Sequence, residues 1–272
     1  MTKPLAIDLF CGLGGWTDGL LEQGWRVRGY DIEAHEYGEE RYPAELVLAD
    51  VMTLNGADLA DADLIVASPP CTEFSYMAMP WSRAKQIARA LRGEDVFPEG
   101  YRGSRTIPEL TALFDACFRI QREANAVRAA RGQPPIPMVV ENVKGAQPWV
   151  GRARWAFGSF FLWGDIPALM PVQKYHERLK VKAGEQWNVN RANFTGTRGW
   201  DDTDDGRKGG GDWFGSGTDC SLQRKASSGS KARKAASAKI AKIPLTLSRH
   251  IARNYLPAAN QNTPPSPQEN AA

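Results

Sequence analysis

The first 31 residues constrain the fold most strongly, because they predict a strand, a glycine-rich turn, a helix and a second strand. The apolar run 5–10 predicts a buried strand, and Cys11-Gly12-Leu13-Gly14-Gly15 predicts a tight turn before a helix over 16–23. Glycines let the backbone of such a turn approach a ligand closely, and the helix N-terminus offers free N–H groups. We therefore expect an α/β fold with a parallel sheet and a ligand at the carboxyl ends of its strands.

The second strand, over 25–30, indicates which ligand that is. It ends in Asp31, roughly 20 residues after the turn, where nucleotide-binding units place an acid that holds a ribose. The glycine spacing differs from the dinucleotide pattern, and the turn has no basic residue to hold a pyrophosphate. This favours a mononucleoside cofactor over NAD. A third strand, over 46–50, ends in Asp50. For both acids the alternative is helix capping or turn formation.

A rigid turn with one cysteine follows the fourth predicted strand, over 63–67. Pro69 and Pro70 fix the backbone ahead of Cys71, so its thiol is expected at a defined place above the sheet. The alternative is a buried loop cysteine, since free cysteines are often small core residues. The Pro-Pro-Cys tripeptide by itself does not separate these two interpretations.

The rest of the chain completes the first domain and adds a variable lobe, a closing helix and a tail. We predict a lid-like loop region over 72–108 with a short helix at 83–91, a helix over 108–131 with Cys117 in the core, a strand over 137–140, and a strand over 157–163. The expected units are a cofactor-binding domain over 1–172, a variable and partly flexible lobe over 173–242, a packing helix over 243–257, and a disordered tail over 258–272.

Composition excludes several classes of protein. No apolar run approaches the ~20 residues needed to span a bilayer, and no signal segment precedes the first strand, so we expect an intracellular, cytoplasmic protein without membrane contact. The four cysteines show no metal-ligand spacing, so we expect no metal. The net charge is only +3, but residues 224–242 contain Lys and Arg without any acid. This segment suits phosphate contacts, or else it is a solvated linker.

Three stretches in order along the chain carry a family resemblance: Asp8-Leu9-Phe10-Cys11-Gly12-Leu13-Gly14-Gly15, Pro69-Pro70-Cys71 and Glu141-Asn142-Val143. Together they resemble the C5-cytosine DNA methyltransferases, in particular compact phage-type members. The resemblance covers about residues 5–165, with a weaker echo over 243–256. It implies a Rossmann-like S-adenosylmethionine-dependent methyltransferase fold with a small irregular target-recognition lobe. The implied activity is methylation of DNA at cytosine C5, as in DNA modification and restriction-modification, by a monomer in the cytoplasm, or in the host cytoplasm if phage-encoded.

The resemblance also implies roles for single residues. Cys71, after Pro70, would add as a thiolate to C6 of a cytosine flipped out of double-stranded DNA. Glu141 would contact N3 and the exocyclic amine, and Asn142 would order the pocket. Asp31 would hold the ribose of S-adenosylmethionine, and Ile32 would cover one adenine face. The remaining cofactor residues are Phe10, Gly12, Gly14 and Gly15 of the turn, and Asp50 and Val51 beside the adenine.

The chain departs from the family at two points. The Gln-x-Arg-x-Arg motif is missing, and Arg152 and Arg154 have only its arginine spacing, so Arg154 is a candidate for the catalytic pocket. The late Gly-Asn motif is missing as well, and we expect the helix around 247–255 to close the fold in its place, with His250 at the surface. Neither the base that removes the C5 proton nor the target sequence is assigned.

Three other functions remain open. The first is an RNA C5-cytosine methyltransferase, because the same thiolate chemistry works on unstacked RNA. The second is a catalytically silent protein that binds the cofactor and DNA, which the missing arginine motif suggests. The third is a folate-dependent pyrimidine hydroxymethylase, which also uses a cysteine at C6 but does not need the turn at 8–15.

Overall fold

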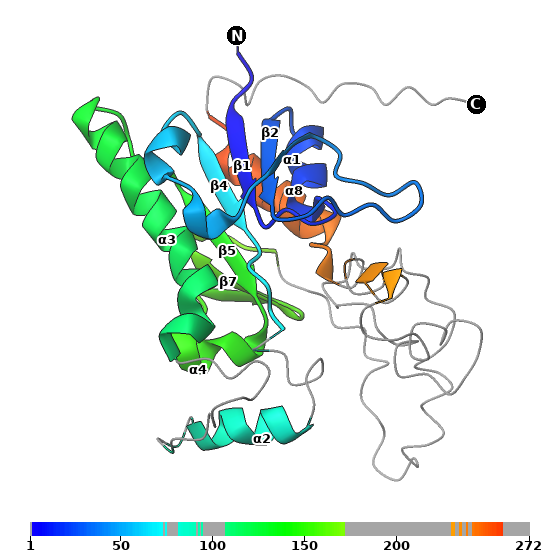
Figure 1. Cartoon of the computed structure of the whole chain (residues 1–272). Coiled ribbons are helices and arrows are strands. Elements are labelled where there is room, and N and C mark those ends of the chain that lie inside the picture. Colours follow the sequence, from blue (N-terminus) through cyan, green and yellow to red (C-terminus); the bar gives the residue numbers. More distant parts are fainter. Residues whose placement is uncertain are drawn as a thin grey trace.

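The computed structural model describes residues 2–72, 107–171 and 241–257, the backbone of helix α2 (Trp81–Ala90), and positions 74, 92, 94, 230, 231, 234, 235 and 238. Most of the predicted recognition lobe and the predicted tail over 258–272 lie outside these residues, so the four predicted units stay predictions. The described part has one central sheet with helices on both faces (Figure 1).

The sheet has seven strands in the order β3-β2-β1-β4-β5-β7-β6. Their bounds are β1 Leu5–Leu9, β2 Arg26–Asp31, β3 Glu45–Leu48, β4 Leu64–Ala67, β5 Met138–Asn142, β6 Trp155–Phe157 and β7 Phe160–Gly164. The first five strands in this order run parallel, and β7 runs antiparallel to both of its neighbours. The strand order reverses between β1 and β4, which is where open α/β sheets bind ligands. The predicted Rossmann-like α/β fold of the first domain is confirmed.

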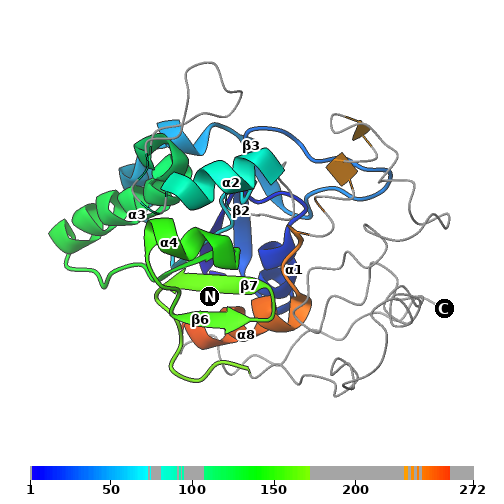
Figure 2. The same ribbon diagram turned by 90° about the horizontal axis from the view of Figure 1, so that it is seen from below.

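Each face of the sheet is covered by helices that bury an apolar layer. Helix α3 (Ile107–Ala130) covers one face, where Phe114 and Ile120 pack with Ile7 and Ile65 of the strands. Helices α1 (Gly15–Glu22) and α8 (Leu245–Tyr255) lie together on the other face. In Figure 2, α8 also runs beside the β6–β7 pair.

The contact between α1 and α8 is close because α1 presents a glycine to it. A Cβ on Gly19 would lie 2.1 Å from the Ser248 hydroxyl and 2.5 Å from the Arg249 backbone nitrogen. On the same face, the Trp25 indole donates a hydrogen bond of 3.1 Å to the carbonyl oxygen of Ala252. A helix, α8, is thus present where the sequence predicts one, and it packs against the first helix of the chain.

One element differs from its prediction. The predicted single strand over 157–163 is wrong, because β6 and β7 form a hairpin in which Phe157 pairs with Phe160. Gly158 makes the reversal possible with a φ of +59°, a left-handed conformation that glycine adopts without strain. The long helix α3 is confirmed, and Cys117 is fully buried in the core as expected. Within the described part, no helix is long and apolar enough to cross a membrane.

Candidate active site

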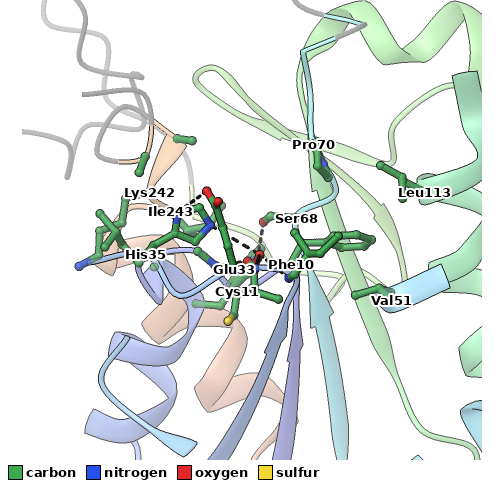
Figure 3. Close-up of a pocket in the computed structure, with 18 of the residues that line it drawn as sticks. Phe10, Cys11, Glu33, His35, Val51, Ser68, Pro70, Leu113, Lys242 and Ile243 are labelled. Atoms are coloured by element: carbon green, nitrogen blue, oxygen red, sulfur yellow. Dashed lines mark hydrogen bonds and ion pairs between the residues drawn. The ribbon is translucent and has the colours of Figure 1, made fainter. Parts of the chain in front are cut away.

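A cavity of about 390 Å³ lies at the carboxyl ends of β1, β2 and β4 (Figure 3). Seven of the eight residues predicted to bind the cofactor line it: Phe10, Gly12, Gly15, Asp31, Ile32, Asp50 and Val51. Ala241, Lys242 and Ile243, just ahead of α8, complete another part of its wall. This volume is within the usual range for small-molecule sites, so the cavity can hold a nucleoside-sized ligand.

The turn after β1 takes an unusual backbone course. Phe10, Gly12 and Gly14 have φ angles of +57°, +52° and +74°, all in the left-handed region. A Cβ on Gly12 would meet no atom within 4 Å, so open space lies directly beside its backbone. Gly14 differs from the other predicted cofactor residues because it does not line the cavity, and a Cβ there would lie 2.6 Å from Pro43 Cδ. The lack of a side chain at Gly14 therefore allows Pro43 to pack against the turn.

Asp31 ties the turn to the end of β2. One carboxylate oxygen accepts a hydrogen bond of 2.9 Å from Gly12 N–H, and the other accepts one of 2.8 Å from Ile32 N–H. Burial alone would raise the pKa of Asp31, but the contact with His35 and these backbone donors hold it below its ordinary value. Asp31 is therefore an anion that lines the cavity. Each carboxylate oxygen has two acceptor positions, so a ligand hydroxyl can still be accommodated.

In the part of the site where adenine is predicted to bind, Asp50 caps a short helix, and Ile32 and Val51 provide apolar surfaces. Asp50 accepts a hydrogen bond of 2.9 Å from Met52 N–H and so caps the 3-10 helix η1 (Val51–Thr53), which was the alternative interpretation of this acid. It lines the cavity as well. Ile32 is 73% exposed although it is apolar, and Val51 is buried in the cavity wall. An exposed isoleucine at a cavity suits contact with a flat apolar ring.

A buried polar cluster supports the turn on its α1 side. The Thr17 hydroxyl donates a hydrogen bond of 2.7 Å to Asp8, and the Tyr42 hydroxyl lies 2.7 Å from the same Thr17 oxygen. Burial raises the pKa of Asp8 well above its ordinary value. Burial therefore favours the neutral form of this carboxyl group, which costs less in the core beneath the turn than a buried charge would.

Hydrogen bonds from both sides fix the loop that carries Cys71. The Trp16 indole donates to the Ser68 hydroxyl at 3.0 Å, and the Asn142 amide donates to the Pro69 carbonyl at 2.9 Å. Ser68 N–H also donates to the Leu9 carbonyl at 3.1 Å, which anchors the loop to the end of β1. The backbone immediately before Cys71 is thus held by three different elements.

Cys71 is the accessible cysteine of the described chain. It is partly exposed, whereas Cys11 and Cys117, the other two described cysteines, are buried. Burial raises the pKa of the Cys11 and Cys117 thiols far above the neutral range. A thiolate is the nucleophilic form of cysteine, so neither buried residue suits that role.

Glu141 and Asn142 end β5, beside the cysteine loop. Ala67 pairs with Val140, so Ser68, the first residue after β4, and Glu141, which is still in β5, lie at the same level along the sheet. Glu141 is only 4% exposed, and Asn142 is fully buried. The structure therefore brings Glu141, Asn142 and the Pro70–Cys71 turn to neighbouring strand ends.

Arg154 lies apart from this group. It precedes β6, its side chain is exposed, and its backbone N–H donates to Leu162 of β7 at 2.8 Å. Strand β7 therefore stands between Arg154 and the strand that carries Glu141. Burial and Asp165 raise the pKa of Tyr255 to about 12, although the charge of Arg154 opposes this. The positive charge of Arg154 thus acts to lower the pKa of Tyr255, the last residue of α8.

Several cavity residues are missing from the sequence prediction. They are Cys11, Leu13, Trp16, Glu33, His35, Ser68, Leu113, Ala238, Ala241, Lys242 and Ile243. Two of them had a signal in the sequence, since Trp16 directly follows the glycine turn and Ser68 directly precedes the proline pair. Leu113, Lys242 and Ile243 come from distant segments and had none. No group of histidine, cysteine and acidic residues in the described part is arranged to hold a metal ion.

Comparisons with known proteins give a family match over the first part of the chain. Residues 5–86 match the model of the C-5 cytosine-specific DNA methylase family. This segment contains the glycine turn, Asp31, Asp50 and the Pro-Pro-Cys loop. No curated protein matches the sequence.

Among solved structures, one similar chain is described as a DNA modification methyltransferase encoded within a prophage (E. coli), with 21% identity and a TM-score of 0.31. Others are a Spodoptera frugiperda DNMT2 mutant, with 18% identity and a TM-score of 0.28, and the Entamoeba histolytica methyltransferase EhMeth, with 16% identity and a TM-score of 0.26. The alignments cover 53%, 53% and 55% of this chain, but only 33%, 37% and 41% of the respective solved chains.

The family match and the site coincide, because the matched segment supplies the turn, the acids and the cysteine loop that surround the cavity. The resemblance drawn from the sequence is thus confirmed over residues 5–86, where the chain matches the C-5 cytosine-specific DNA methylase family.

Proposed function

We propose that the chain is a DNA (cytosine-5-)-methyltransferase that transfers a methyl group from S-adenosylmethionine to a flipped-out cytosine through a covalent adduct with Cys71. One observation carries this proposal. Pro70 lines the cavity in which the cofactor is expected, and the next residue is the accessible Cys71. A single short loop therefore joins the cofactor cavity to the nucleophile.

The residues at the cavity fit S-adenosylmethionine. Asp31 is an anion with remaining acceptor capacity for ribose hydroxyls, and Ile32 offers an exposed apolar face for adenine. The open space beside Gly12 leaves room for the ligand next to the backbone of the turn. When bound, the cofactor supplies an electrophilic methyl group on a sulfonium sulfur. The chain's own part is to hold the cofactor across the strand ends.

The chemistry on cytosine begins at Cys71. Its thiolate would form a bond to C6, and the ring electrons would move to C5, which becomes nucleophilic enough to take the methyl group; the bond from sulfur to methyl breaks, and the thioether S-adenosylhomocysteine is the leaving group. Glu141 holds a proton at N3 and so stabilises the charge that develops as sulfur adds. Loss of the C5 proton returns an electron pair to the ring, which expels the Cys71 thiolate and restores aromatic cytosine.

Asn142 keeps Cys71 in position during this cycle. Its amide donates to the Pro69 carbonyl, and its side-chain oxygen accepts from Val143 N–H at 2.8 Å. Both polar ends of a fully buried side chain are therefore engaged with backbone. For Arg154, which the sequence suggested for the catalytic pocket, we instead propose contact with the DNA, because its exposed position before β6 suits a backbone phosphate better than the buried side of Glu141.

Duplex DNA is the proposed substrate because the family that matches residues 5–86 is a DNA methylase family. Cytosine C5 and C6 are covered inside a duplex, so the target base must leave the stack to reach Cys71. We propose that the chain acts as a monomer in the cytoplasm of the cell, in DNA modification.

The test measures transfer of labelled methyl groups to duplex DNA and to tRNA in parallel, with Cys71→Ala as the matched variant. The proposal expects labelled DNA from the wild-type chain and none from the variant. Label in tRNA alone would replace the proposal with RNA methylation. Cofactor binding without transfer to either substrate would support a silent binding protein. Bisulfite sequencing of DNA from cells that express the chain would then give the target sequence.

A further inference from the structure

The hydrogen bond between Trp16 and Ser68 joins two residues that both line the cavity. Trp16 is the second residue of α1 and only 2% exposed, and Ser68 is the first residue after β4. An indole N–H can only donate, so the Ser68 hydroxyl oxygen must be the acceptor in this 3.0 Å contact. The hydroxyl hydrogen of Ser68 is therefore not directed at Trp16 and remains available as a donor.

The position of Ser68 along the sheet indicates which part of a ligand it meets. The cavity is lined from successive strand ends: Asp50 after β3, Asp31 at β2, the turn after β1, and Ser68 after β4. Neighbouring strands are about 4.8 Å apart, so Ser68 lies about three strand spacings from Asp50. Figure 3 shows Ser68 beside Phe10 and Pro70, on the approach to the cysteine loop. A ligand with its adenosine at Asp31 and Asp50 has its other end at Ser68.

The chemistry of the cofactor then selects one acceptor. The methionine half of S-adenosylmethionine contains an ammonium group, a sulfonium sulfur and a carboxylate, and only the carboxylate accepts hydrogen bonds. A hydroxyl that can donate at this end of the cavity therefore has a single partner on the ligand. Hydrogen bonds from a neutral donor to an ionised acceptor are among the stronger ones in proteins.

We infer that Ser68 is a cofactor-binding residue whose hydroxyl, oriented by the Trp16 indole, donates to the carboxylate of the cofactor's methionine half. Trp16 is then a positioning residue that acts through Ser68. Ser68 N–H donates to Leu9, so the backbone of Ser68 is fixed and only its hydroxyl needs to be oriented. The inference rests on the proposed function, because it takes S-adenosylmethionine as the ligand.

The test compares two ligands by calorimetry on the full chain. S-adenosylhomocysteine has the methionine-type carboxylate, and 5′-methylthioadenosine has the same nucleoside and thioether but lacks both the carboxylate and the ammonium group. Ser68→Ala is expected to weaken S-adenosylhomocysteine binding about tenfold and to leave 5′-methylthioadenosine unchanged. Ser68→Thr keeps the hydroxyl and is expected to bind both ligands as the wild type does.

Trp16→Phe and Trp25→Phe form the matched pair for the positioning role. Both remove an indole N–H from a fully buried tryptophan on the same face of the sheet, but Trp25 donates to Ala252 of α8. Trp16→Phe is expected to weaken only S-adenosylhomocysteine binding, about threefold, with no further loss when Ser68→Ala is added. Trp25→Phe is expected to change neither affinity. If Trp16→Phe fails to fold, the two Ser68 variants decide.

The outcomes separate the inference from the proposed function. Wild-type protein that does not bind S-adenosylhomocysteine would overturn the proposed function and the inference with it. Wild-type binding with an unchanged Ser68→Ala affinity, or an equal loss for both ligands, would overturn the inference alone.

Discussion

The side-chain amide of Asn142, at the end of β5, donates a hydrogen bond of 2.9 Å to the carbonyl oxygen of Pro69, two residues before Cys71. Strands β4 and β5 are neighbours in the sheet, and this bond connects the end of β5 to the loop that follows β4. It links the Glu-Asn motif to the Pro-Pro-Cys loop, and the two bonded residues are 73 positions apart in the sequence. The position of the Cys71 loop therefore depends on a residue of the neighbouring strand.

Replacement of Asn142 tests this link. Asn142→Ala leaves the buried Pro69 carbonyl without its donor, and we expect a loss of about 1–3 kcal/mol in the free energy of unfolding, with slower formation of the Cys71–DNA adduct. The control is Asn125→Ala, since Asn125 also bonds backbone, at Ile136 N–H, but lies on α3 away from Cys71. Urea unfolding and adduct formation are measured for both variants. Equal adduct rates in the two variants would refute the positioning role.

Glu141→Gln separates chemistry from binding. The amide cannot protonate N3 as a carboxylic acid does, so we expect single-turnover methyl transfer to fall about 100-fold or more. The affinity for S-adenosylhomocysteine should change little, because Glu141 does not line the cofactor cavity. Glu123→Gln on α3 is the control, as Glu123 accepts hydrogen bonds from Gly56 and Arg119 and does not line the cavity. Equal losses of transfer and cofactor affinity in Glu141→Gln would contradict its pocket role.

His35, at the edge of the cavity, is expected to make the free energy of unfolding depend on pH. Its contact with Asp31, 3.5 Å from Nε2 to Oδ1, raises the pKa of His35, and Glu33 adds to this while Lys234 opposes it. A raised pKa in the folded state gives stability that is complete below the unfolded value of about 6.5 and is lost as pH rises through the folded value. We expect His35→Gln to remove this contribution, at most about 1 kcal/mol for a partly exposed pair.

The measurement for His35 is the free energy of unfolding between pH 6 and pH 9, for wild type, His35→Gln and Tyr37→Phe. Tyr37→Phe removes the hydroxyl 3.2 Å from Nδ1 but leaves the Asp31 contact intact. It should keep the pH dependence that His35→Gln loses. A wild-type protein that gains stability across this window would show that the sign is wrong.

Gly19 tests whether α8 completes the cavity wall. Gly19→Ala places a Cβ against the backbone of Arg249, and we expect a loss of about 1–3 kcal/mol from overpacking. Cofactor affinity should fall with it, because Lys242 and Ile243 line the cavity just ahead of α8. Leu21→Ala, at a 39% exposed position of the same helix, is the control and should cost less than about 1 kcal/mol. Unchanged cofactor binding in a destabilised Gly19→Ala variant would show that the packing of α8 does not support the cavity wall.

Much of the fold follows from local patterns in the sequence. Buried parallel strands are short apolar runs, and the glycines after β1 mark a turn that other residues rarely adopt. The hairpin of β6 and β7 escaped prediction because apolar residues flank its turn on both sides, so Phe157 to Trp163 looked like one buried strand. Only Gly158 marked the reversal, and one glycine within an apolar run does not distinguish a turn from a bulge.

The candidate site was predictable where motifs supply it and unpredictable where distant segments meet. Asp31 and Cys71 lie at strand ends that the sequence marks clearly. The bond from Trp16 to Ser68 joins residues 52 positions apart, and Lys242 reaches the cavity from the far end of the chain. Such contacts depend on how α1, β4 and α8 pack, which local propensity does not encode.

The most direct test of the central claim uses duplex DNA in which 5-fluorocytosine replaces the target cytosine. Fluorine at C5 cannot leave as a proton does, so the adduct cannot eliminate the enzyme thiol. With S-adenosylmethionine present, we predict a stable protein–DNA complex whose digest maps the attachment to Cys71 by mass spectrometry. Cys71→Ser should form none, and Cys117→Ala, altered at a buried cysteine, should still form it. Active enzyme that methylates normal DNA but forms no complex, or forms one at another residue, would contradict the account.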